Sequence, residues 1–192
     1  MAHMFRFGKA VRAVVAGVAT AGLLAGCSEA EPKAVPKLPS PRVCWGALAG
    51  SEVSPLLPQG DKVSIRARPF VLAESTDAVT CNVNVDGNVM FAAHATYWKF
   101  EDEVDWSPYD GAHPRPLDVG RKGIIWPGGA GTHFVCEPST SSSDPGKYIE
   151  LSINVYKPPD KEETQKALPK LLQEFLTFAE RELKCPGASA KK

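Results

Sequence analysis

The most regular feature of the chain is a set of short segments in which apolar and polar residues alternate. Apolar residues occupy every second position in residues 62–68, 79–85 and 148–156. Because successive side chains of a strand point to opposite faces, each segment predicts a strand with one buried face and one face toward solvent. The polar face of residues 62–68 carries Lys and Arg. Such cations protect an edge strand from pairing with another chain, or they form a binding stripe.

Residues 79–98 predict a hairpin around Asp86-Gly87-Asn88. A two-residue turn places Val79 opposite His94, whereas a three-residue turn with a bulge places Cys81 opposite Ala93 and matches apolar residues across the strands. We therefore favour the second register.

A second hairpin is predicted over residues 123–136, with its turn at Pro127 to Gly131. Residues 99–121 lie before it and show neither a strand period nor a helix period. A loop of this length inside a compact domain is usually functional or mobile.

Helical patterns lie at the two ends of the domain. Near the start, Ser51 or Ser54-Pro55 begins one or two short helical turns. After Asp160, apolar residues recur every three or four positions to about Lys184, which predicts an amphipathic helix that Pro169 kinks or restarts. The predicted fold class is α+β: an antiparallel sheet of five or six strands, a C-terminal amphipathic helix packed on one face, and a short N-terminal helical segment.

Composition and charge narrow the class of protein. The 192 residues are 43% hydrophobic, and 22 basic residues balance 22 acidic ones. This composition is too rich in core residues for a disordered chain, and the balanced charge argues against a nucleic-acid partner.

The N-terminus has the pattern of an export signal. Residues 1–12 contain three basic and no acidic residues, and residues 13–26 form an apolar run of 14 residues. Such a run is about 21 Å long as a helix, shorter than a bilayer core of roughly 30 Å. Without residues 1–26 the chain keeps 19 basic and 22 acidic residues, a net charge of −3.

The segment Leu24-Ala25-Gly26-Cys27 resembles the lipobox of bacterial lipoproteins. The resemblance implies that residues 1–26 are a lipoprotein signal peptide and that Cys27 receives a diacylglyceryl group, which anchors the chain to the cell membrane on its extracytoplasmic face. Residues 27–42 are then the lipid anchor and a proline-rich tether, residues 43–185 the domain, and residues 186–192 a disordered tail.

Four further cysteines predict disulfides, because their number is even and the chain is predicted to be exported. They are Cys44, Cys81, Cys136 and Cys185. Of the three pairings that four cysteines allow, we favour Cys44–Cys81 with Cys136–Cys185, since each ties an end of the domain to a neighbouring strand. A zinc site is the competing interpretation. It has little support, because only His133 and Cys136 lie close together in the sequence.

Candidate binding residues gather around the 99–121 loop. Trp98, Trp106 and Tyr109 stand near a run of acidic residues, and exposed aromatic groups beside carboxylates bind sugars or partner proteins. His113 lies in the same loop. The alternative is that these aromatic residues form part of the core and a lid over it.

No motif for acyl transfer, phosphate binding or zinc hydrolysis is present in the sequence, and we predict no metal, no cofactor and no catalytic residues. Two alternatives stay open. An envelope hydrolase would use His113 with Glu101 or Asp105 as acid and base. A carrier of a hydrophobic ligand would need a cavity between sheet and helix.

Several segments resemble small actinobacterial lipoproteins of unknown function. They include Val43-Cys44-Trp45-Gly46-Ala47-Leu48, Gly123-Ile124-Ile125-Trp126 and Glu182-Leu183-Lys184-Cys185. The resemblance implies surface exposure, paired disulfides and a non-catalytic body. We therefore expect a membrane-anchored module that binds a protein or an envelope glycan through the 99–121 loop.

Overall fold

The computed structural model describes residues 34, 35 and 37–185. The predicted signal peptide, the lipidated Cys27, the first part of the tether and the tail at 186–192 lie outside these residues. The short elements of the described part are β1 (Arg42–Val43), β2 (Leu48–Ala49), α1 (Gly50–Val53), η1 (Ser54–Leu56), η2 (Glu101–Glu103), η3 (Ser107–Ala112) and β6 (Arg115–Leu117). The longer ones are β3 (Val63–Ala67), β4 (Ala78–Val85), β5 (Asn88–Trp98), β7 (Arg121–Trp126), β8 (Gly129–Glu137), β9 (Lys147–Val155) and α2 (Lys161–Glu182).

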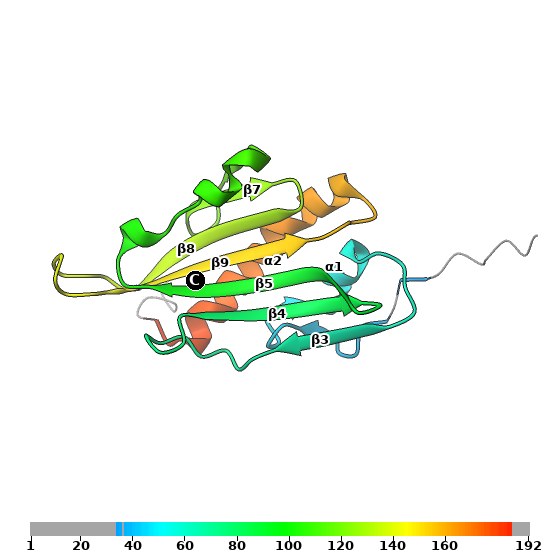
Figure 1. Cartoon of the computed structure of the whole chain (residues 1–192), viewed down its shortest axis with the longest axis horizontal. Helices are drawn as coiled ribbons and strands as arrows, with labels where there is room; N and C mark the ends of the chain where they lie inside the picture. The colour runs from blue at the N-terminus through cyan, green and yellow to red at the C-terminus, as the bar shows by residue number, and fades with distance from the viewer. Residues whose placement is uncertain (1–33, 36, 186–192) are drawn as a thin grey trace, which may run out of the picture. The chain divides into compact units, whose positions relative to one another are not determined.

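The fold is α+β, as predicted. Seven antiparallel strands form one sheet in the order β3-β4-β5-β9-β8-β7-β6, and β1 pairs with β2 separately. The long helix α2 runs behind this sheet in Figure 1. The sheet has more strands than the five or six predicted, partly because Arg115–Leu117 pairs with β7 inside the segment predicted as a loop.

The core lies between α2 and the inner face of the sheet. The alternation seen in the sequence places Val83, Phe91 and Ile153 on this face, all fully buried, against Leu171 and Phe175 of the helix. The other face of the sheet, which we call the outer face, carries mostly polar side chains. A single helix layer therefore covers one face of the sheet and leaves the other to loops and solvent.

The hairpin of β4 and β5 has the favoured register, with Cys81 opposite Ala93. The extra residue is not in the turn, however. Asp86 and Gly87 form a two-residue turn with φ of 49° and 84°, the left-handed values that this tight turn requires. The bulge lies within the strands, beside Val83 and Asn84.

Helix α2 begins where Asp160 predicts, since its side chain accepts hydrogen bonds from the backbone N–H groups of Glu162 and Glu163. It continues through Pro169 to Glu182. The N-terminal helical segment is also present, as α1 and η1, with Pro55 in the first turn of η1.

Both disulfides have the favoured pairing. Cys44 bonds to Cys81 of β4, and Cys136 of β8 bonds to Cys185 just beyond α2. One therefore joins the N-terminal segment to the sheet, and the other joins the end of the helix to it.

Part of the predicted tether packs on the domain. Leu38 contacts the core cluster, and the backbone N–H of Gly50 donates to the Pro41 carbonyl at 2.7 Å. Arg42 donates to the carbonyls of Gly46 and Ala47. The packed part of the chain thus begins before residue 43.

Candidate functional site

Three aromatic side chains form a continuous row on the outer face of the sheet. The ring centroids of Trp106 and Tyr109 are 6.0 Å apart, and those of Tyr109 and Trp126 are 4.1 Å apart. We call these three residues the aromatic ridge. Trp126 is buried, with 6% of its surface exposed, whereas the two loop residues are only half-buried. The ridge therefore offers part of its aromatic surface to a ligand.

Two glycines of β8 explain why the ridge can lie against the sheet. A Cβ on Gly131 would lie 2.6 Å from the Trp106 ring, and a Cβ on Gly129 would lie 2.3 Å from the Trp126 ring. Only a strand without side chains at these positions leaves room for both rings. The prediction that residues 127–131 form a turn was therefore wrong in part: only Pro127 and Gly128 turn, and the next glycines belong to the strand.

Polar side chains of β9 lie next to the ridge. Ser152 and Asn154 neighbour the Tyr109 hydroxyl, and burial raises the pKa of that hydroxyl. At the end of β5, the indole Nε1 of Trp98 donates to Glu150 Oε2 at 2.8 Å. Aromatic surface and hydrogen-bonding groups thus alternate over a short distance on this face.

Glu150 is the least solvated carboxylate of the site. Burial raises its pKa, the Trp98 hydrogen bond opposes this effect, and the negative charge of Asp105 adds to it. Asp105 itself is exposed and has a lowered pKa, because the backbone N–H and the hydroxyl of Ser107 both donate to it. The two carboxyl groups therefore have opposite tendencies to hold a proton.

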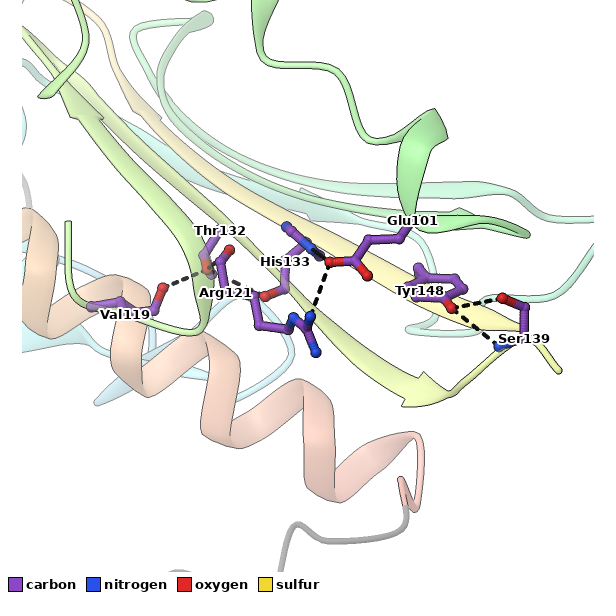
Figure 2. A network of polar contacts seen from close by, with 7 residues as sticks. All are labelled: Glu101, Val119, Arg121, Thr132, His133, Ser139 and Tyr148. Atoms are coloured by element: carbon purple, nitrogen blue, oxygen red, sulfur yellow. Dashed lines mark hydrogen bonds and ion pairs between the residues drawn. The ribbon is translucent and has the colours of Figure 1, made fainter. Parts of the chain in front are cut away.

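A charged cluster attaches the start of the loop to the sheet (Figure 2). Glu101 Oε1 lies 3.1 Å from His133 Nε2 and 3.3 Å from the Arg121 guanidinium. A carboxylate can only accept a hydrogen bond, so Nε2 of His133 carries the proton. The pKa of Glu101 is lowered, first by this hydrogen bond and then by Arg121. We call Glu101, His133 and Arg121 the clasp.

Two further contacts shown in Figure 2 hold neighbouring loops. The Thr132 hydroxyl donates to the Val119 carbonyl at 2.5 Å, and the Tyr148 hydroxyl lies 3.0 Å from the Ser139 hydroxyl. These contacts fix the segments that flank the clasp.

The structure brings together three of the four predicted binding residues. Trp106 and Tyr109 belong to the aromatic ridge, and Trp98 donates a hydrogen bond to Glu150, whose charge acts on the Tyr109 hydroxyl. His113 is exposed at the end of η3, with φ of 52°, and its ring makes no hydrogen bond to any described residue. His113 is therefore not part of the aromatic ridge.

The acid and base of the hydrolase alternative are not assembled. Glu101 contacts His133 and Arg121 instead of His113, and Asp105 contacts Ser107. The layer between sheet and helix, where a hydrophobic ligand would lie, is occupied by fully buried side chains such as Leu151, Leu168 and Phe175.

Sequence reasoning missed Trp126, Glu150, Ser152 and Asn154 as site residues. The strand pattern of residues 148–156 contains the signal for three of them, because their positions alternate with the buried ones and so share the outer face. Nothing local in the sequence indicates that the 99–121 loop folds over that face.

Within residues 34, 35 and 37–185, no group of three or more His, Cys, Asp or Glu side chains is placed to hold a metal ion. The same part of the chain contains no helix that is both long and apolar enough to span a bilayer. No family model matches the chain, and no curated protein or solved structure matches it either.

Proposed function

We propose that this chain is a lipid-anchored, extracytoplasmic binding module, without catalytic activity, that holds a protein or an envelope glycan on the outer face of its sheet. The aromatic ridge, seated on two glycines beside polar side chains, is the observation that carries this proposal. Exposed aromatic edges next to hydrogen-bonding groups suit a ligand that is both flat and polar.

The location rests on two separate arguments. The signal-like N-terminus and the lipobox resemblance concern residues outside the described part. The two disulfides support an oxidising compartment, since such bonds persist mainly outside the cytoplasm. Mass spectrometry of the chain purified from membranes tests the anchor: a diacylated Cys27 at the N-terminus supports it, and an unmodified Cys27 refutes it.

The binding function is tested by capture from an envelope extract. The full-length chain, solubilised in detergent, is compared with Trp106→Ala/Tyr109→Ala and with the control His113→Ala, which changes an exposed residue of the same loop that is not part of the ridge. We expect the ridge variant to lose the ligands that the wild type and the control retain. Identical ligands for all three chains would refute a role for the ridge, provided that thermal unfolding shows each variant to be folded.

A second candidate is hydrolysis of a glycan at the same face. It is favoured by two carboxyl groups with opposite pKa shifts, because the pKa of the half-buried Glu150 is raised and that of the exposed Asp105 is lowered, and glycosidases use a pair of carboxyl groups whose pKa values differ in this way. Release of reducing ends from a captured glycan by the wild type, and its loss in Glu150→Gln, would establish this activity in place of simple binding.

A further inference from the structure

A groove with two arginines lies on the outer face at the opposite end of the sheet from the ridge. Its volume is about 290 Å³, and it is lined by Arg66, Ala67, Arg68, Thr80 and Asn82 of strands β3 and β4 and the residue that follows β3. Both arginines are exposed. The groove also offers a hydroxyl and an amide, so all of its polar groups can bind an oxygen-rich ligand.

The two arginines differ from others in the described part of the chain. Arg42, Arg121 and Arg181 each form an ion pair with a glutamate. Arg66 and Arg68 form no ion pair or side-chain hydrogen bond with any described residue. Two unpaired guanidinium groups in one groove favour an anion, because each can donate two parallel hydrogen bonds to a carboxylate or a phosphate.

A path of cross-strand neighbours on the outer face connects the groove to the ridge. The sheet register places Arg66 beside Asn82, Asn82 beside Ala92, and Ala92 beside Asn154, which neighbours the Tyr109 hydroxyl. Adjacent strands are roughly 4.8 Å apart, so the three steps from β3 to β9 span about 14 Å. A short oligosaccharide can cover this distance.

The floor of the path suits a ligand rich in hydroxyl groups. Ala92, between the two asparagines, is buried, and the adjacent row of cross-strand neighbours on the same face runs from Thr80 through His94 to Ser152. His94 Nδ1 lies 3.0 Å from the Thr80 hydroxyl, and burial lowers the pKa of the ring. The middle of the path is therefore polar without being charged.

We propose that the outer face binds an anionic glycan, with a sugar ring against Trp106 and Tyr109 and a carboxylate or phosphate group in the Arg66/Arg68 groove. This inference rests on the proposed binding function and specifies its ligand. The charge distribution determines the orientation: the exposed Asp105 carboxylate, next to Trp106 at the ridge end, repels an anion, whereas Arg66 and Arg68 attract it at the other end.

Calorimetric titration of the full-length chain in detergent tests the proposal. The probes are hexagalacturonate for a carboxylate, glucosylated poly(glycerol phosphate) for a phosphate, fully methyl-esterified hexagalacturonate as the neutral counterpart, and poly-glutamate as an anion without sugar. We expect at least one of the two anionic glycans to bind more tightly than both the methyl-esterified hexagalacturonate and poly-glutamate. Its binding should weaken with added salt.

The variants separate the two ends of the face. Arg66→Ala/Arg68→Ala should raise the Kd of the anionic glycan at least tenfold, which corresponds to about 1.4 kcal/mol. Trp106→Ala/Tyr109→Ala should have an effect of similar size. The matched control Lys161→Ala/Arg181→Ala removes the same number of charges from α2, outside the outer face, and should leave the Kd within twofold.

Three results would overturn the proposal: equal binding of poly-glutamate, an arginine variant that binds like the wild type, or no binding of either anionic glycan at millimolar concentration. The proposed function fails separately. If no glycan binds but the envelope capture still depends on the ridge, the chain is a binding module for another ligand, such as a protein. If the capture does not depend on the ridge either, both proposals are wrong.

Discussion

The contact between Gly131 and Trp106 can be tested by adding one methyl group. A Cβ at Gly131 would lie 2.6 Å and 2.8 Å from two carbons of the Trp106 ring, whereas the nearest backbone atom, the Leu151 carbonyl oxygen, is 3.4 Å away. Carbon atoms reach their optimal separation at about 3.5–4.0 Å, so the ring must retreat by about 1 Å. Gly131→Ala should therefore displace the loop and leave the strand in place.

The expected cost is that of overpacking, about 1–2 kcal/mol of the free energy of unfolding. For a domain of this size that loss lowers the Tm by roughly 3–6 °C. Gly111→Ala in η3 is the matched control, because its added Cβ meets nothing within 4 Å. Both changes remove a glycine from the unfolded chain, so the difference between them isolates the clash with the ring.

A double-mutant cycle measured by urea unfolding decides whether Trp106 is the group that the methyl meets. In the Trp106→Ala background the cost of Gly131→Ala should fall to nearly zero, because the ring is gone. An equal cost in both backgrounds, or a Gly131→Ala chain as stable as the wild type, would refute the described packing. The same variant should bind the envelope ligand less tightly, since its ridge is displaced.

Three further predictions concern the frame and the charges of the site. Cys136→Ser/Cys185→Ser should lower the free energy of unfolding by about 2–5 kcal/mol in urea titration, because it frees the end of α2 from the sheet. Glu101 has a lowered pKa, so its contribution to stability is present above the ordinary value of 4.5 and is lost as the pH falls through the folded value. Glu101→Gln should therefore be less stable than the wild type at neutral pH and should lose less stability on acidification. The control Asp102→Asn, which changes an exposed neighbour, should follow the wild type. Parallel curves of stability against pH for Glu101→Gln and the wild type would contradict this prediction. Glu150 has a raised pKa, so ionisation is less favourable in the folded state, and Glu150→Gln should be more stable than the wild type at neutral pH, with the difference shrinking as the pH falls toward 4.5. A Glu150→Gln chain that is less stable at neutral pH would show that the Trp98 hydrogen bond outweighs the burial of the charge.

The sheet and its helix were predictable because their signals are local. The period of two in residues 148–156 and the period of three to four after Asp160 depend only on which side chains face the core. The disulfide pairing followed from the same elements, since each bond joins an end of the domain to a strand. The position of the bulge beside Val83 could not be predicted from the pattern. A bulge within the strand and a longer turn both pair Cys81 with Ala93.

The site was harder to predict because it depends on long-range packing. The aromatic residues of the loop were recognised, but the residues that they contact lie on β7, β8 and β9. The Trp106 ring fits against β8 only because Gly131 has no side chain. A glycine in a strand and a glycine in a turn look alike in the sequence. His113 differs from its neighbours: it shares the loop with Trp106 and Tyr109, yet it lies exposed at the end of η3 and does not belong to the aromatic ridge.

The way the loop is held bears on how the outer face binds. The clasp anchors η2, the stacked rings anchor η3, and β6 pairs with β7, so the segment between Trp98 and Arg121 is attached to the sheet at three places. A ligand that binds beside an already ordered loop does not have to supply the free energy of ordering it. Each attachment uses a different interaction: charge, aromatic contact and strand pairing. Acid or salt should therefore loosen η2 first and leave the ridge in place. If binding weakens as salt is added while the ridge stays ordered, the loss comes from the Arg66/Arg68 groove and not from displacement of the ridge.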